Sequence, residues 1–393
     1  MRKVLIGILG ATALAIGASP ASAQGTVKIG VIMTLSGQFA DAGVQMQNGV
    51  KTYMQQFGDT VGGKKIELIV KDSGGMAPDV AKRLAQELVV RDRVDILAGF
   101  VLTPNALAGG DVSAEAKKFM VVMNAATSIV TTKSPYIVRS SVTLPQVAET
   151  FGKWAATKGG VKKTYSMVTD YGPGHDFEAG FHRAFKEAGG EVIGQVRFPV
   201  ANPDFSAFIQ RAKDLNPESI MIFVPGGAQP AALGKAFAER GIDPNKTKIL
   251  GSGETTAEQA LKSMGDASLG IITAWHYDYM SKDAKNVQFV KLYNDMHKRN
   301  PDFFSIGGYD GMHVIYESLK KAGGKTDGDS LIAAAKGLKW DSPRGPMSID
   351  PETRDVVQTI YIRKVEKVSG ELTNVPFDKV ENVKDPVKAR MPR

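Results

Sequence analysis

Cysteine is absent from the 393-residue sequence. The chain therefore cannot be built on a disulfide scaffold, and it offers no thiol for a lipid anchor of the bacterial lipoprotein type. The composition also lacks the signature of disorder, because 43% of the residues are hydrophobic and only 23% are charged. A folded protein stabilised by packing alone is expected, and at this length two lobes are the simplest arrangement.

Long apolar runs are confined to the N-terminus. Two basic residues, Arg2 and Lys3, precede an apolar stretch that reaches Ala18, and the following segment ends at Ala23 in a small-x-small pattern. This combination is typical of a secretory signal peptide and is too short for a membrane-spanning helix. We therefore predict that residues 1–23 are a signal peptide, cleaved near Ala23, and that the mature protein is soluble and exported.

A strong charge of one sign is also missing. The formal net charge of +8 falls to +6 without residues 1–23, and lysines and arginines stand beside acidic residues along the chain. Such interspersed charge indicates solvated helix faces and not a stripe that follows a phosphate backbone. No nucleic-acid partner is expected.

The familiar catalytic and metal-binding motifs are absent too. The sequence contains no GxxxxGK[ST] phosphate loop, no GxSxG elbow and no HExxH helix, and its five histidines are scattered. Asp170 and Asp176 could form an acid/base pair, although both positions suit ordinary helix capping. We predict no catalytic residues, no metal and no cofactor.

Short β-branched runs alternate with longer amphipathic stretches, which predicts an α/β fold. The expected strands of a first series are 27–33, 65–72, 94–100 and 119–126, and the helices between them are 43–57, 77–92 and 103–118. A second series has strands 163–170, 191–198, 219–225 and 247–253 and helices 176–189, 205–215 and 230–241. Two such series indicate two doubly wound parallel-sheet lobes.

The remaining segments suggest where the lobes divide. A Ser/Thr/Pro-rich stretch separates the two series, and helices at 286–299, 309–321 and 329–336 follow the second one. Gly370 is expected in a turn between a strand and a short return, and the last ten or so residues are expected to fray. We predict one lobe from residues 24–142 and 274–343 and the other from residues 143–273 and 344–393.

Ligands of doubly wound sheets bind beyond the carboxyl ends of the strands. In the first series, Thr103 is a plausible N-cap beside Leu102, so backbone N–H groups of a helix start would be free there. Small Ala125 and Ala126 precede Thr127, which permits close approach of a carboxylate to N–H groups and a hydroxyl. Simple helix caps without a ligand explain these residues equally well.

Four strand ends of the second series carry further candidates. Tyr171 stands at a strand end where its ring could cover a cleft, and Gly227 keeps the backbone open. Glu254 is the acid best placed to meet a ligand ammonium, although a solvated acid in a helix turn is an equal alternative. Trp275 begins a run of three aromatic rings that favours a cleft wall or a hinge cover.

Several of these segments resemble a known family. The motifs are "VKIGVIMTLSGQFADAGVQMQNGV", "VVRDRVDILAGF", "NAATS", "TDYGPG" and "IDPETRDVVQTIYIRKVEKV". Together they are similar to the branched-chain amino acid (Leu/Ile/Val) binding proteins of ABC importers, over essentially the whole mature chain. The resemblance implies a type I periplasmic binding protein, with two α/β lobes joined by a three-segment hinge, in the periplasm.

The resemblance also implies roles for individual residues. Ala125, Ala126 and Thr127 match the segment that grips the carboxylate and ammonium of the ligand, and Tyr171 matches an aromatic residue that covers it. Glu254 falls near the acid that binds the ammonium. Two departures concern Leu102, where amino-acid binders usually carry a hydroxyl, and the neighbourhood of Gly227, where an aromatic residue is replaced.

The leading hypothesis is thus a monomeric solute-binding protein that delivers an amino acid to an ABC permease in the inner membrane. An aromatic carboxylate such as a hydroxybenzoate-like acid is the alternative ligand, because the departures weaken the case for Leu, Ile or Val and because "NAATS" and "SPRG" resemble family members associated with such acids. A ligand-sensing partner of a receptor and an exported hydrolase are the remaining alternatives.

Overall fold

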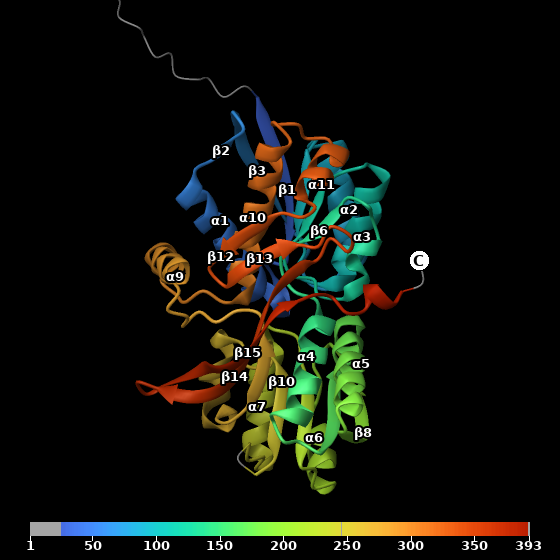
Figure 1. Cartoon of the computed structure of the whole chain (residues 1–393), viewed down its shortest axis with the longest axis vertical. Coiled ribbons are helices and arrows are strands. Elements are labelled where there is room, and N and C mark those ends of the chain that lie inside the picture. Colours follow the sequence, from blue (N-terminus) through green and yellow to red (C-terminus); the bar gives the residue numbers. More distant parts are fainter. Residues whose placement is uncertain (1–24, 245, 392–393) are drawn as a thin grey trace, which may run out of the picture.

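The computed structural model describes residues 25–244 and 246–391. The predicted signal peptide, residues 1–23, lies outside the described residues. The chain forms two α/β lobes stacked along the long axis of the molecule, as Figure 1 shows. The predicted fold class is confirmed.

The first lobe is built on a six-stranded sheet with the order β2-β3-β1-β4-β5-β6. All its pairings are parallel except that of β2 with β3. Strands β1, β4, β5 and β6 are mostly or fully buried, which suits a parallel sheet covered on both faces. The strands are β1 (Thr26–Met33), β2 (Thr60–Val61), β3 (Lys64–Asp72), β4 (Ile96–Gly99), β5 (Met120–Val122) and β6 (Ile137–Arg139).

Helices from both halves of the chain cover this sheet (Figure 1). Helix α1 packs against α10, α2 packs against α3, and α10 packs against α11. These helices are α1 (Ala40–Phe57), α2 (Pro78–Val90), α3 (Thr103–Glu115), α10 (Phe303–Lys321) and α11 (Gly328–Ala335), with α9 (Ala284–His297) beside α1.

The second lobe contains the parallel strands β11-β10-β9-β7-β8, and the long antiparallel β14 joins this sheet at β11. Strand β15 pairs with β14, and the hairpin β12–β13 pairs with the N-terminal end of β14. The parallel strands are β7 (Lys163–Thr169), β8 (Glu191–Phe198), β9 (Ser219–Phe223), β10 (Lys248–Ser252) and β11 (Ile272–Trp275). The antiparallel strands are β12 (Lys339–Ser342), β13 (Gly345–Ile349), β14 (Val356–Val368) and β15 (Glu371–Val383).

The helices of the second lobe follow its strands in order. They are α4 (Leu144–Thr157), α5 (Gly172–Glu187), α6 (Phe205–Asp214), α7 (Ala228–Arg240) and α8 (Glu258–Met264). Short 3-10 turns complete the described chain: η1 (Gly37–Phe39), η2 (Ser128–Thr132), η3 (Gly265–Ser268) and η4 (Lys388–Arg390).

Arg344 ties the segments that run between the lobes. Its guanidinium pairs with Asp310 (Nε to Oδ2, 2.8 Å) and donates to Gln358 Oε1 (2.8 Å) and to the Ser140 carbonyl. The side chains of Arg344 and Asp310 have no solvent exposure. Because Ser140 follows β6 and Gln358 belongs to β14, this one arginine links two crossings of the hinge to α10.

The structure corrects four expectations from the sequence. The Ser/Thr/Pro-rich stretch contains β6, and the unpredicted α4 follows it behind a capping box of Thr143 and Gln146. Helix α10 starts at Phe303 and not at 309, because Asp302 caps it. The return strand β15 is as long as β14, and in the described tail, residues 384–391, Asp385 and Lys388 bond to Ser128 and Thr131 of the first lobe instead of fraying.

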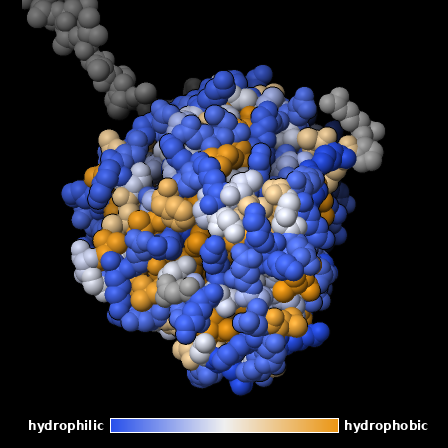
Figure 2. All heavy atoms as spheres, turned by 60° about the horizontal axis from the view of Figure 1, so that its bottom comes forward, coloured by the Kyte–Doolittle hydropathy of each residue, from blue (hydrophilic) through white to orange (hydrophobic). Residues whose placement is uncertain are grey.

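Hydrophilic residues dominate the face drawn in Figure 2, and apolar residues appear there in dispersed patches. This distribution agrees with the interspersed charges of the sequence. No helix within the described ranges combines the length and the hydropathy needed to cross a bilayer.

Candidate functional site

A small cavity lies where the two lobes face one another, at the carboxyl ends of their strands. It encloses a free volume of about 20 Å³, which is room for about one water molecule. Its walls are Phe39, Val101, Leu102, Thr103, Asn124, Ala126 and Phe304 from the first lobe and Tyr171, Pro173, Pro225, Gly226 and Glu254 from the second. Five of the nine residues predicted from the sequence are therefore brought together here.

The start of α3 forms part of the first-lobe wall. The helix begins at Thr103, and its N-cap is Leu102, without a side-chain cap, so the prediction of Thr103 as N-cap is wrong by one residue. Thr103 Oγ1 accepts hydrogen bonds from Thr127 Oγ1 (3.1 Å) and from the Thr127 N–H (3.4 Å). Because Thr103 acts only as an acceptor in these bonds, its own hydroxyl proton is available to a ligand in the cavity.

The segment after β5 contributes Asn124 and Ala126 to the cavity. Asn124 is held by a bond from its Nδ2 to the Val101 carbonyl (2.7 Å). The Ala125 N–H donates to the Phe100 carbonyl (3.0 Å) and its carbonyl accepts from Arg139 (2.9 Å), so the polar backbone groups of Ala125 are already used. Ala125 stands behind the wall, and Ala126 faces the cavity.

Glu254 is the acid of the second-lobe wall. Its side chain is 6% exposed, and its Oε2 accepts a hydrogen bond from the Gly226 N–H (2.7 Å). Burial raises the pKa of Glu254 to about 7, although the bond from Gly226 opposes this shift. A carboxyl group that titrates near neutrality can accept a hydrogen bond from a ligand hydroxyl or pair with an ammonium group.

Tyr171 caps α5 from an extended backbone and places its ring 6.2 Å from that of Phe223. Burial, followed by the charge of Glu254, raises the pKa of the Tyr171 hydroxyl well above its usual range. The phenol is therefore a neutral donor, and together with Phe39 and Phe304 it makes the cavity rich in rings.

The two lobes touch at three further places around the cavity. The Ser128 N–H donates to Asp176 Oδ2 on α5 (2.8 Å). A Cβ on Gly172 would lie 3.2 Å from Thr127 Oγ1, and one on Gly227 would lie 2.7 Å from the Gln38 carbonyl oxygen. Thr127 and Gly227 thus stand at the contact between the lobes and do not line the cavity.

Trp275 lies deeper than expected. It has no solvent exposure, it packs edge-on against Phe303 at 5.1 Å, and it leaves no room for a Cβ on Gly253, which would approach its ring to 2.1 Å. The ring supports the turn that carries Glu254 from behind and is not part of the cavity wall.

Phe39, Asn124 and Phe304 line the cavity although they were not singled out from the sequence. Phe39 follows the Leu-Ser-Gly turn and Asn124 opens the "NAATS" motif, so both stood in segments that already pointed to a ligand. Phe304 belongs to the first turn of α10, and only the packing of α10 on α1 brings it to the cleft.

Larger hollows exist elsewhere on the surface. One of about 700 Å³ lies between α8 and the β14–β15 hairpin, and it is lined by residues of both charges such as Lys262, Arg299 and Glu371. It is wide and open, and it lies away from the strand ends that carry the candidate residues. Among residues 25–244 and 246–391, no group of three or more His, Asp or Glu side chains could hold a metal ion.

Comparisons with known proteins agree with this geometry. A family model described as periplasmic binding protein matches residues 26–371. The Leu/Ile/Val-binding protein homolog 6 of Brucella melitensis biotype 1 is 40% identical over 392 residues, with 98% of this chain and 99% of the relative aligned.

Two solved structures of solute-binding proteins of ABC transporters are also similar. The protein from Rhodopseudomonas palustris BisB5 in complex with 3,4-dihydroxybenzoic acid is 51% identical, with a TM-score of 0.89 over 92% of this chain and 99% of that one. The protein from R. palustris HaA2 in complex with p-hydroxybenzoic acid is 38% identical, with a TM-score of 0.90 over 93% and 100% of the two chains.

Proposed function

Because the chain belongs to the periplasmic binding protein family and is the solute-binding component of an ABC transporter, we propose that its ligand is a hydroxylated aromatic carboxylate. Like its relatives, the protein is a solute-binding protein and not an enzyme. The observation that carries the ligand proposal is the cavity between the lobes, which is lined by three aromatic rings and one buried carboxyl group.

The polar groups at the two ends of the cavity suit the two ends of such a ligand. The uncapped start of α3 and the hydroxyl of Thr103 attract a carboxylate. Glu254 lies on the opposite lobe and accepts a hydrogen bond from a ring hydroxyl. The rings of Phe39, Tyr171 and Phe304 cover the aromatic faces, and Leu102 adds apolar surface where an amino-acid binder would carry a hydroxyl.

The complexes of the relatives support this ligand class. The 51% identical relative was solved with 3,4-dihydroxybenzoic acid and the 38% identical one with p-hydroxybenzoic acid. The proposed site residues are Leu102, Thr103, Ala126, Tyr171 and Glu254 in direct contact. Ala125, Thr127, Gly227 and Trp275 support the walls from behind or at the contact between the lobes.

An aliphatic amino acid is the second candidate. Glu254, once ionised, would meet an ammonium group, and the 40% identical relatives are named Leu/Ile/Val-binding protein homologs. The two candidates differ in what Glu254 receives, a neutral hydroxyl or a cation, and this difference is measurable.

The protein acts, in this proposal, as a periplasmic monomer that passes its ligand to a permease in the inner membrane. Residues 1–23 serve as the cleaved signal peptide. The lobes comprise residues 24–142 with 274–343 and residues 143–273 with 344–393. In support, the strands of the first sheet lie between Thr26 and Arg139, and the parallel strands of the second lie between Lys163 and Trp275.

Binding and closure are coupled in this arrangement. The ligand docks on the first lobe at Thr103 and Ala126 while the lobes are apart, and closure adds Tyr171 and Glu254. Water is expelled, so the polar contacts strengthen in the low-dielectric cleft. Since the ligand contacts both lobes only in the closed form, it shifts the population toward that form.

A thermal-shift titration of the mature protein tests the proposal. The panel contains 4-hydroxybenzoate, 3,4-dihydroxybenzoate, benzoate, leucine and valine, and a ligand at about 100 times its Kd stabilises the protein by about 2.7 kcal/mol. We expect the hydroxybenzoates to raise Tm most. A response confined to leucine and valine would replace this ligand class by the second candidate.

A further inference from the structure

The chain makes an additional passage between the lobes after β15. Within the described tail, residues 384–391, the side chains of Asp385 and Lys388 turn back onto the first lobe. Asp385 is 4% exposed, and its Oδ2 accepts a hydrogen bond from Ser128 Oγ (2.8 Å). Lys388 Nζ donates to Thr131 Oγ1 (2.5 Å) and pairs with Asp355. The tail thus contacts the residues that directly follow the ligand-facing segment.

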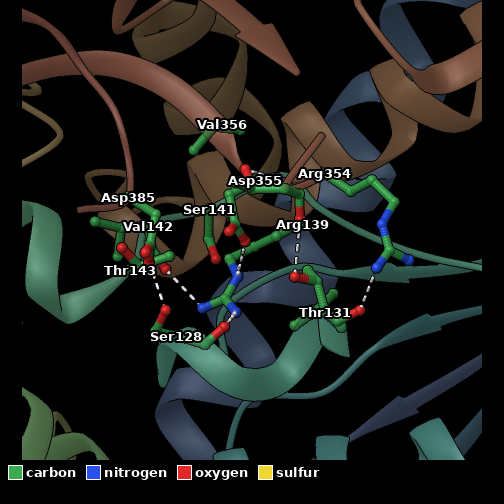
Figure 3. A network of polar contacts seen from close by, with 12 residues as sticks. Ser128, Thr131, Arg139, Ser141, Val142, Thr143, Arg354, Asp355, Val356 and Asp385 are labelled. Atoms are coloured by element: carbon green, nitrogen blue, oxygen red, sulfur yellow. Dashed lines mark hydrogen bonds and ion pairs between the residues drawn. The ribbon is translucent and has the colours of Figure 1, made fainter. Parts of the chain in front are cut away.

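Arg139 lies against the same segment, with its guanidinium group turned toward Ser128, as Figure 3 shows. Its guanidinium donates to the carbonyls of Ala125 (2.9 Å) and Thr127 (2.8 Å), and also to those of Val142 and Ser128. Its side chain has no solvent exposure. One arginine therefore fixes two of the three peptide units that lead from Ala125 to Ser128.

This fixing determines where the N–H groups point. In a trans peptide the N–H of the next residue points opposite to the carbonyl, and the described chain has no cis peptide. Because Arg139 draws the Thr127 carbonyl inward, the Ser128 N–H points outward, and it is found on Asp176 of the other lobe. The Ala125 carbonyl is likewise bonded to Arg139, so the N–H of Ala126 points away from Arg139. It points to the side on which Ala126 lines the cavity.

Asp355 joins Arg139 to the tail. Its carboxylate pairs with Arg139 Nε through Oδ1 (3.1 Å) and with Lys388 Nζ through Oδ2, and it is 1% exposed. The two buried cations Arg139 and Lys388 thus share the buried carboxylate of Asp355. Removing one member leaves an uncompensated buried charge, so the position of Arg139 depends on the tail.

We infer that Arg139 is a positioning residue that aims the backbone N–H of Ala126 at the ligand carboxylate, and that Lys388 of the C-terminal tail holds it in place through Asp355. This inference rests on the proposed function for the presence of a carboxylate. The orientation of the segment itself can be measured without any ligand.

The test compares K388M with K384M in the full mature chain. Lys384 belongs to the same tail, but its side chain is 65% exposed, and its partner Asp350 also accepts hydrogen bonds from the N–H groups of Glu352 and Thr353, so K384M is the matched control. Binding is measured by calorimetry with 3,4-dihydroxybenzoate and with leucine, and amide hydrogen exchange is measured for residues 122–143 and for α6 as a remote reference. A double variant, K388M/D385N, removes one charge of each sign and guards against failure of K388M to fold.

We expect K388M to weaken the binding of whichever probe binds the wild type by about tenfold and to speed exchange in residues 122–143 but not in α6. K384M should match the wild type in both measurements. Unchanged exchange and unchanged affinity in K388M or in K388M/D385N would overturn the inference, as would an equal rise of exchange in α6.

The two proposals fail in different ways. If neither probe binds the wild type, the proposed ligand class is wrong. The exchange measurement alone then tests whether the tail positions residues 122–143. If the wild type binds and K388M weakens binding while exchange in residues 122–143 stays unchanged, the tail does not act through this segment and the inference is wrong.

Discussion

The backbone N–H of Ser128 donates to the carboxylate of Asp176 at 2.8 Å and thereby joins the first lobe to the start of α5 in the second. Burial raises the pKa of the Asp176 carboxyl, and the bond from Ser128 opposes the shift. Since this contact exists only while the lobes touch, it stabilises the closed form.

Replacing Asp176 tests this contact. D176A should weaken ligand binding by about tenfold, because a hydrogen bond to a charged group contributes about 1.5–3 kcal/mol and is lost from the closed form alone. D176N keeps an acceptor oxygen and should stay close to the wild type. Calorimetry measures the affinity, and small-angle scattering should show a larger radius of gyration for D176A at subsaturating ligand. Equal affinities for D176A and D176N would contradict this role.

The titration of Glu254 predicts a pH-dependent stability. The ordinary pKa of 4.5 rises to about 7 in the fold. Between these values the folded protein holds a proton that the unfolded chain has lost, so the contribution of Glu254 to stability falls as the pH rises from 4.5 to 7. E254Q lacks this titrating group. Between pH 4.5 and 7 its free energy of unfolding should therefore rise by about 3 kcal/mol relative to that of the wild type.

Urea unfolding at pH 4.5, 6 and 8 measures this difference. E187Q, which changes an exposed glutamate on α5, serves as control and should run parallel to the wild type. A constant offset between E254Q and the wild type at all three pH values would show that Glu254 titrates normally.

The same substitution separates the two ligand candidates. At pH 8, where the Glu254 carboxyl is ionised, E254Q should weaken the binding of 4-hydroxybenzoate by about tenfold, because a charge-assisted hydrogen bond becomes a neutral one. The affinity for benzoate, which has no ring hydroxyl, should fall by about twofold at most. If leucine is the ligand, the loss should exceed about a hundredfold because its ammonium becomes unpaired. Equal losses for benzoate and 4-hydroxybenzoate would remove Glu254 from the hydroxyl end of the site.

Gly227 should be intolerant of a side chain for a reason specific to closure. Its φ of 107° belongs to the region that favours glycine, and a Cβ there would meet the Gln38 carbonyl oxygen of the other lobe at 2.7 Å. G227A should therefore bind the ligand about tenfold more weakly or worse. G241A is the control: its φ is also positive, at 63°, but the nearest atom to its Cβ belongs to Lys213 of the same lobe. A normal affinity in G227A would show that the lobes close without this contact.

The buried pair of Arg344 and Asp310 should dominate the stability of the hinge. R344M leaves the Asp310 carboxylate uncompensated in a fully buried place and should lower the free energy of unfolding by about 3–5 kcal/mol. K320M, which removes an exposed partner of Glu317 on the same helix, should change it by less than about 1 kcal/mol. Chemical denaturation gives both free energies. If R344M lost as little stability as K320M, the bonds from Arg344 to Gln358 and Ser140 would not stabilise the hinge.

The sequence predicted the parallel strands of both sheets except β6, because these strands are short runs between polar turns. It did not predict β6, because three residues give too short a pattern and β6 is recognised only by its pairing with β5. The burial of Asp385 and Lys388 was equally invisible, since a charged C-terminal segment is normally exposed and only the matching charges of Arg139 and Asp355 make its burial stable.

The site was partly predictable for a related reason. Leu102, Ala126, Tyr171 and Glu254 were found because strand ends of such folds converge on one edge. The sequence could not show that the Ala125 N–H is bonded to the Phe100 carbonyl, because that bond joins two adjacent strand ends. Nor could it place Trp275 behind Gly253, since burial against a glycine depends on the packing of the whole hinge.

The cavity of about 20 Å³ also constrains the order of events in time. An aromatic acid is many times larger than one water molecule, so the walls of this cavity must move apart to admit it. Encounter must precede closure, and the observed relaxation rate in a stopped-flow experiment should increase with ligand concentration and level off at the rate constant of closing. The lifetime of the complex is then set by how often the lobes part, which makes reopening the step that a transport partner has to accelerate.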